Sequence, residues 1–186
     1  MVVVTVRHQR QRRLRKFSEA KGVGKRMVAK FKTQEKVVVN ASVFLTAVLL
    51  DEPMDIRLPA TIMVARVNTG SIEAHIPDRF EDEVFGGLVE AFTKGRPLTT
   101  TFDSVVIALQ HFMTIASVHH RGVDWQAQEV LRTALRWRVS YYDAIYLTIA
   151  QKVGATYWTA DKKLLRFLQR QKFVDLPQMA WIGSYK

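Results

Sequence analysis

Short apolar runs alternate with amphipathic stretches along most of this chain. The run VVV at 37–39 suits a buried parallel strand, and apolar positions recur at helical spacing in the segment that follows it. The same alternation continues to the end of the chain. It predicts strands at 37–39, 73–77, 115–119, 155–159 and 179–182, with helices at 42–50, 58–67, 78–94, 99–113, 125–137, 141–153 and 164–169. Because strands and helices alternate, we expect a three-layer α/β fold with a central parallel sheet flanked by helices.

The stretch YYDAIYLTIAQKVGATYWTAD at 141–161 combines a helix, a turn, a strand and a terminal acid. Gly154 stands where a helix C-cap is expected. Asp143 then falls in the first turn of the helix, and Asp161 falls just past the carboxyl end of the strand, where ligands collect in open parallel sheets. Singly, each Asp is explained by capping or turn formation. Together, two carboxylates at one rim require a proton or a cation between them, and oxygen ligands suit Mg²⁺ or Mn²⁺.

Composition narrows the class of protein. With 186 residues, of which 48% are hydrophobic, the chain is sized for one domain with a real core and an appendage. The absence of cysteine excludes disulfides and thiolate metal sites, which fits a cytoplasmic location. The apolar runs are interrupted and too short to span a bilayer, so we expect no membrane association.

Nearly all of the net charge lies at the amino terminus. Residues 1 to 36 hold 12 Lys or Arg against 2 Glu, which is +10 of the total of +11. This segment is consistent with a phosphate-binding arm, with an organelle-targeting peptide or with a solvated extension, and the last is slightly favoured. We therefore divide the chain into a basic, flexible extension at 1–36 and a folded domain at 37–186.

The order of residues in this carboxyl-terminal stretch matches the motif of a known protein family. YDAIYLTIAQKVGATYWTAD closely resembles the motif of PIN-domain ribonucleases, in particular the VapC-type toxins of toxin–antitoxin pairs. Their pattern is Tyr-Asp-Ala, an aliphatic helix, a Gly-Ala turn and a strand that ends in Thr-Ala-Asp. The resemblance implies a PIN-like fold over 37–186 and a metal-dependent endoribonuclease activity. It also implies an RNA substrate, a cognate antitoxin protein and a homodimer.

The resemblance extends to two more positions. Family members end the first strand with Asp-Ala-Ser, whereas this chain has Asn-Ala-Ser, which puts Asn40 at the first acidic position. Glu83 matches the family's Glu on the helix after the second strand, although acids are also favoured there by the helix dipole. Asn40, Glu83, Asp143 and Asp161 would then hold one or two Mg²⁺ or Mn²⁺ ions that activate a water. An amide at position 40 removes one formal charge, so we expect weaker ion binding and slower chemistry; whether Asn40 is natural or an inactivating change stays open.

Other polar residues lie close to this set in the sequence. Ser42 and Thr159 would orient the acids. Arg132, Arg136 and Arg138 precede the motif, and they form either a solvated face or a phosphate clamp at the rim of the acidic site. A second function from another class also fits the sequence: a catalytically silent PIN-like module that binds RNA or a partner protein.

Deletion of residues 1 to 36 tests the role of the basic extension. Because this segment holds most of the charge and none of the candidate ligands, its removal should weaken RNA binding and flatten the dependence of affinity on salt. Thermal stability should stay close to that of the full chain. Fluorescence anisotropy at several salt concentrations and a thermal melt measure both. A deletion that unfolds the domain would show that the extension belongs to the core.

Overall fold

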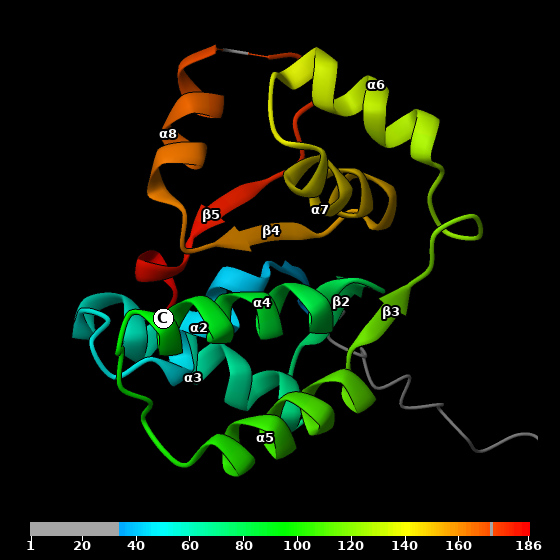
Figure 1. The fold of residues 1–186 in the computed structure, drawn as a ribbon. Helices are drawn as coiled ribbons and strands as arrows, with labels where there is room; N and C mark the ends of the chain where they lie inside the picture. The colour runs from blue at the N-terminus through cyan, green and yellow to red at the C-terminus, as the bar shows by residue number, and fades with distance from the viewer. Residues whose placement is uncertain (1–33, 172) are drawn as a thin grey trace, which may run out of the picture. The chain divides into compact units, whose positions relative to one another are not determined.

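A computed structural model describes residues 34–171 and 173–186, so the predicted basic extension lies outside the described residues except for its last three (Figure 1). The strands are β1 (Lys36–Val39), β2 (Glu73–Pro77), β3 (Ser117–His119), β4 (Thr156–Thr159) and β5 (Met179–Trp181). The helices are α2 (Ala41–Val48), α3 (Met54–Asn68), α4 (Phe80–Thr93), α5 (Phe102–Ile115), α6 (Ala127–Trp137), α7 (Tyr141–Val153) and α8 (Lys162–Gln171), and a 3₁₀ turn, η1 (Ile182–Ser184), follows β5.

The five strands form one parallel sheet in the order β3-β2-β1-β4-β5. β1 lies at its centre, and Val38 pairs with His75 of β2 on one side and with Tyr157 of β4 on the other. Val37, Val38 and Val39 are fully buried, as expected for a strand covered on both faces. The chain winds from β1 outward to β3, then returns to the other side of β1, so the strand order reverses between β1 and β4. The predicted α/β fold is confirmed.

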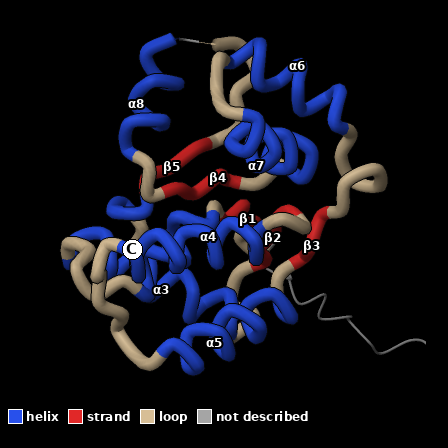
Figure 2. The backbone as a smooth tube through the Cα atoms, viewed as in Figure 1, coloured by secondary structure: helices blue, strands red, loops and turns tan. Residues whose placement is uncertain are grey.

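Helices cover both faces of the sheet. Figure 2 shows α6 and α7 on one side of the strands and α3, α4 and α5 on the other. On the second side, Phe44, Phe80 and Phe112 from three helices pack together, with ring centroids of Phe80 and Phe112 5.4 Å apart. α7 packs directly on β1, β2 and β4, and α6 packs on α7. Among the described residues, no helix has the length and apolar character needed to cross a bilayer.

Most predicted boundaries agree with the structure to within a few residues. Gly154 ends α7 in the left-handed conformation (φ 65°), which confirms the predicted C-cap. α3 starts at Met54, four residues before the predicted start, because the chain enters the helix directly after Pro53. Pro59 therefore lies in the second turn of α3. Because proline has no N–H, the carbonyl of Asp55 in the exposed first turn lacks its helical hydrogen bond, and no other helical hydrogen bond is lost.

The start of the sheet overlaps the predicted extension. The carbonyl oxygen of Glu35 accepts a hydrogen bond of 2.9 Å from the Glu73 amide, and Lys36 is the first residue of β1. Residues 35 and 36 thus belong to the amino end of the central strand. A deletion that leaves the sheet intact ends at residue 33.

Two histidines meet on neighbouring strands. Nδ1 of His75 on β2 lies 3.0 Å from Nε2 of His119 on β3, and Nε2 of His75 lies 3.1 Å from the Glu73 carboxylate. Burial, reinforced by His119, lowers the pKa of His75 although Glu73 opposes the shift. Burial also lowers the pKa of His119, against the attraction of Asp124. The folded pair therefore resists protonation more than the same two side chains do in the unfolded chain.

This pair predicts a pH dependence of stability. Below about pH 6.5 the unfolded chain takes up protons at His75 and His119 that the folded chain does not, so the free energy of unfolding should fall as the pH falls from 7 to 5. His75→Gln should reduce the slope of that fall. Urea denaturation at several pH values measures it, with the exposed His111→Gln as the matched control. Equal slopes for the wild type and His75→Gln would contradict the assignment.

Candidate acidic site at the carboxyl edge of the sheet

The candidate site lies at the point where the strand order reverses. Asn40 follows β1 directly, and its backbone amide donates a hydrogen bond of 3.0 Å to the carbonyl oxygen of Trp158 in β4. Asp161 comes two residues after Thr159, the last residue of β4. Because β1 and β4 are parallel neighbours, both residues stand at the carboxyl edge of the sheet, where ligands bind in open α/β folds.

Asn40 and Asp161 also begin helices. Oδ1 of Asn40 accepts from the Ser42 amide at 2.9 Å and caps α2, while Oδ1 of Asp161 accepts from the Lys163 and Leu164 amides at 2.8 and 2.9 Å and caps α8. Helix capping therefore accounts for Oδ1 of Asn40 and for Oδ1 of Asp161. The caps fix the rotamers of both side chains at the sheet edge.

Two hydroxyl groups join the end of β4 to the start of α2. Oγ of Ser42 accepts from the Ala160 amide at 3.1 Å and lies 3.4 Å from Oγ1 of Thr159, which in turn accepts from the Asp161 amide at 3.0 Å. Ser42 and Thr159 thus fix the main chain that carries Asp161. Their hydrogen bonds are made with the backbone of this turn. The predicted role of orienting the acids would therefore depend on the position of the turn.

Asp143 lies in the first turn of α7, which runs antiparallel to β4 and so starts at the same edge. Ser140 caps the helix: its Oγ accepts from the Asp143 amide at 3.0 Å and donates to Oδ2 of Asp143 at 2.6 Å. Burial raises the pKa of Asp143 and the negative charge of Asp161 adds to the shift, while the Ser140 hydrogen bond opposes it. Asp143 and Asp161 are therefore electrostatically coupled.

Glu83 is the most perturbed acid of the set. It lies in the first turn of α4, and Oε2 accepts a hydrogen bond of 3.1 Å from the Tyr146 hydroxyl of α7. Its Oε1 is buried and has no hydrogen-bond partner among the described residues. Burial raises the pKa of Glu83 to about 7, and the charge of Asp143 contributes. An exposed acid that merely complements the helix dipole would show neither feature, so the dipole alone does not explain Glu83.

Two tyrosines complete the site, and sequence reasoning did not identify them. Tyr146 follows Asp143 by three residues on α7, so both side chains lie on the same side of the helix. The buried hydroxyl of Tyr157 on β4 has no hydrogen-bond partner among the described residues, and burial followed by the charge of Asp143 raises its pKa. The helical spacing to Asp143 was the one signal in the sequence that could have indicated Tyr146.

The carboxylate groups are of the ligand type that a divalent cation prefers, but they are not close enough together to coordinate one ion as they stand. Within the described part of the chain, no three Asp, Glu or His side chains are close enough together to hold a metal ion. The structure does couple Glu83 to Asp143 and Asp143 to Asp161. A buried carboxylate oxygen without a partner in the described residues, near the half-buried acid Asp143, is a donor set that a proton or a hard cation would stabilise.

Two of the three arginines line a hollow that includes none of these acids. Arg132 and Arg136 line a hollow of about 310 Å³ on α6 and α7, together with Gln151, and none of the four candidate site residues lines it. Nη2 of Arg136 forms an ion pair of 3.0 Å with Asp175. Arg138 closes α6 in the left-handed conformation (φ 53°). Their role in RNA binding stays a prediction.

A second hollow, of about 330 Å³, does adjoin the site. Its lining includes Ser42 and Asp161, together with the apolar residues Leu45 of α2, Leu49 at the C-cap of that helix and Ile56 of α3. One rim is held by Arg96, which donates two hydrogen bonds of 2.8 and 2.9 Å to the carboxylate of Asp51. Sequence analysis did not indicate this hollow, because its lining comes from segments far apart in the chain.

Comparison with known proteins shows a shared fold. No protein-family model and no curated protein matches the sequence. The crystal structure of PAE2754 from Pyrobaculum aerophilum superimposes over 83% of this chain and 90% of that chain, with a TM-score of 0.55 and 18% identity. VapBC2 from Rickettsia felis, bound to a DNA fragment from its promoter, matches over 78% of this chain and 98% of that chain, with a TM-score of 0.48 and 10% identity.

The chain shares its fold with PAE2754. The first likeness, over most of both chains, establishes the three-layer α/β arrangement as one that occurs in a solved structure. The second is too distant to add to it.

The raised pKa of Glu83 predicts a stabilising substitution. Between about pH 4.5 and 7 folded Glu83 holds a proton that the unfolded chain releases, so its contribution to stability falls as the pH rises through this range. Glu83→Gln removes that fall. In a metal-free buffer, its free energy of unfolding at pH 8 should exceed that of the wild type by about 1 to 2 kcal/mol, after allowance for partial solvent exposure, with little difference at pH 5.

Urea denaturation at the two pH values measures the effect. Glu81→Gln, which removes the same charge from the same helical turn, is the control and should track the wild type at both. A Glu83→Gln protein that is no more stable than the wild type at pH 8 would show that the carboxyl group is not strained in the folded state.

Proposed function

We propose that this protein is a metal-dependent endoribonuclease, the toxin half of a toxin–antitoxin pair. The observation that carries the proposal is the half-buried carboxyl group of Glu83 at the carboxyl edge of a parallel sheet. Its Oε1 is buried without a hydrogen-bond partner among the described residues, and its pKa is raised, with a contribution from Asp143. Acids with perturbed pKa values cluster at catalytic sites. The motif around Asp143 and Asp161 supports the choice of reaction, and its usual companions are an RNA substrate, a cognate antitoxin and a homodimeric state.

Mg²⁺ or Mn²⁺ would be held by Glu83, Asp143 and Asp161, with the amide oxygen of Asn40 in place of a fourth carboxylate. When bound, the ion would activate a water and neutralise charge that develops on the phosphodiester. The chain itself keeps Glu83 poised: the Tyr146 hydroxyl holds Oε2, which leaves Oε1 as the atom that carries a proton at low pH. Loss of that proton near neutral pH makes the carboxylate available as a ligand.

The supporting residues act on the positions of the acids. Ser140 holds Asp143 through two hydrogen bonds at the start of α7. Ser42 and Thr159 fasten the turn that carries Asp161. Substitutions at these three hydroxyl residues should therefore weaken metal binding without removing a ligand.

A second candidate is a catalytically silent PIN-like module that binds RNA or a partner protein. Two observations favour it: the amide at position 40, and the absence of a group of three acidic or His side chains within reach of one ion in the described residues. The two candidates differ in what a carboxylate at position 40 would do.

The first test of the proposal is metal affinity. Calorimetric titration with Mn²⁺ should give weak binding to the wild type, and binding tighter by at least about tenfold to Asn40→Asp, because a new negative charge would lie within a few ångströms of the ion. Asp143→Ala should weaken binding in both backgrounds. Asp103→Asn, an exposed acid in the first turn of α5, is the control. Equal affinity for the wild type, Asn40→Asp and Asp143→Ala would rule out this metal site.

The second test is cleavage. Asn40→Asp should raise Mn²⁺-dependent cleavage of single-stranded RNA by at least about tenfold, since a ligand carboxylate is worth a kcal/mol or more of transition-state stabilisation. The same change should make expression toxic to the host cell, and Asp143→Ala in the same chain should abolish both effects. An Asn40→Asp protein that binds RNA or a partner protein but cleaves none of a varied RNA set would establish the silent module.

A further inference from the structure

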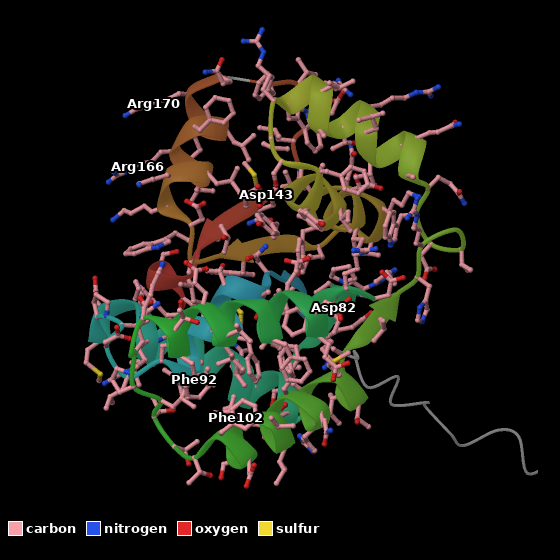
Figure 3. All side chains as sticks on the ribbon, viewed as in Figure 1. Asp82, Phe92, Phe102, Asp143, Arg166 and Arg170 are labelled. Carbon is pink, nitrogen blue, oxygen red and sulfur yellow. The ribbon has the colours of Figure 1, made fainter. Side chains whose placement is uncertain are left out.

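Helix α8 presents a row of positive charges to solvent. Its sequence, KKLLRFLQRQ, has four basic residues and no acid. Lys163, Arg166 and Arg170 recur at i, i+3 and i+7, so they lie along one side of the helix over about 10 Å. All three are exposed, while Leu165 and Leu168 face the core. Figure 3 shows Arg166 and Arg170 pointing away from the domain on the same side of α8.

This row, Lys163, Arg166 and Arg170, differs from six other basic side chains of the domain, each of which lies beside a carboxylate. Ion pairs of that kind are Lys36–Glu73, Arg66–Glu35, Lys94–Glu90, Arg96–Asp51, Arg136–Asp175 and Lys152–Glu129. None of the three residues in the row pairs with a carboxylate of the described residues. The near-neutral charge of residues 37–186 therefore conceals a local excess of positive charge on α8.

The helix dipole favours only one of the three charges, that of Arg170 in the last turn of α8. Two lysines, Lys162 and Lys163, occupy the first turn of α8, where the helix dipole disfavours cations by about 0.3 to 1 kcal/mol each. Lys162 finds a partner in the ring of Trp181, 4.0 Å away. Lys163 has no such partner in the described structure. Its charge is placed against the local electrostatic preference, which points to a ligand outside the chain.

The row starts at the acidic site. Asp161 caps α8, so Lys163 lies on the first turn beyond the acids and the row leads outward from them. A cluster of carboxylates repels a polyanion, and a row of cations beside it offsets that repulsion for a strand that approaches along α8. The hollow of Arg132 and Arg136 has no such relation, because none of the candidate acids lines it.

We propose that Lys163, Arg166 and Arg170 bind successive phosphates of single-stranded RNA and guide the strand toward the acidic site. The inference rests on the proposed function. A membrane surface does not fit, because the apolar side of α8 is buried in the domain and is not free to enter lipid. A protein partner fits less well, because the row lacks the apolar centre of a protein interface. A narrow row of charge complements a linear polyanion.

The first experiment compares two triple variants of the full chain. Lys163→Gln/Arg166→Gln/Arg170→Gln removes the row, and Arg132→Gln/Arg136→Gln/Arg138→Gln removes the same charge from the rival surface. Fluorescence anisotropy with a labelled single-stranded RNA in EDTA, over a range of salt concentrations, measures affinity without cleavage. The α8 variant should bind at least about tenfold more weakly, with a log–log salt slope smaller by about 2, as expected for three lost phosphate contacts.

The α6 variant should stay closer to the wild type in both quantities. An α8 variant that matches the wild type, or an α6 variant that loses more affinity, would overturn the inference. Thermal melts of both variants check that neither effect reflects unfolding.

The absence of cysteine permits a second, local measurement. Arg166→Cys and Arg132→Cys each introduce one thiol that can carry a photo-crosslinker. We expect RNA to crosslink at position 166 and not at 132, and unlabelled RNA to compete far better than polyglutamate. Polyglutamate that competes as well as RNA would instead identify a surface for acidic protein segments.

Activity separates this inference from the proposed function. If Asn40→Asp cleaves RNA and loss of the α8 row leaves the KM unchanged, the inference fails and the nuclease stands. If the row binds RNA but Asn40→Asp is inert, the nuclease proposal fails and the binding surface stands. A wild type that neither binds nor cleaves RNA overturns both.

Discussion

The half-buried carboxyl group of Glu83 is the constraint on which the candidate site depends. One oxygen receives the Tyr146 hydroxyl, and the other is enclosed without a partner among the described residues. Folding leaves such a group only two inexpensive states, protonated or bound to a cation, because a bare carboxylate in this environment loses its hydration. The Tyr146 hydroxyl of α7 reaches the Glu83 carboxyl group of α4, and the charge of Asp143 in the same helix as Tyr146 adds to the rise in its pKa. The domain is therefore less stable at neutral pH than it would be with an uncharged side chain at position 83.

Sequence patterns indicated which acidic and amide residues lie at the carboxyl edge of the sheet, but not the buried polar groups around them. Apolar runs and turn residues predicted the strands, and parallel pairing of β1 with β4 then brings Asn40 and Asp161 to one edge, whatever the details of packing. Tyr157 was not predictable from the sequence, because the environment of its hydroxyl depends on how α7 packs over β1, β2 and β4. The surroundings of the arginines were also not predictable, since the ion pair of Arg136 is formed with Asp175, 39 residues further along the chain. Local signals specify elements, whereas burial of a polar group is a property of the assembled layers.

Charge in this domain is arranged in two opposing parts. The acids are recessed at the sheet edge, where burial raises the pKa of both Glu83 and Asp143. The cations of α8 stand in solvent, where water and salt screen them and leave each side chain free to move. Asp161 belongs to both parts, because its carboxylate faces the acids and also caps α8. The acidic site and the basic helix therefore share one residue and are built by the same turn.

The cap at Asn40 has a consequence for how the protein can change. An N-cap oxygen serves the start of α2 equally well from an amide or from a carboxylate, since Asn and Asp are about equal as N-caps. Exchange at this position leaves the first helix, the sheet and the core as they are. A lineage can therefore exchange an amide for a carboxylate at this edge of the sheet in one step, without passing through a misfolded ancestor. Selection at position 40 is then free to act on chemistry alone.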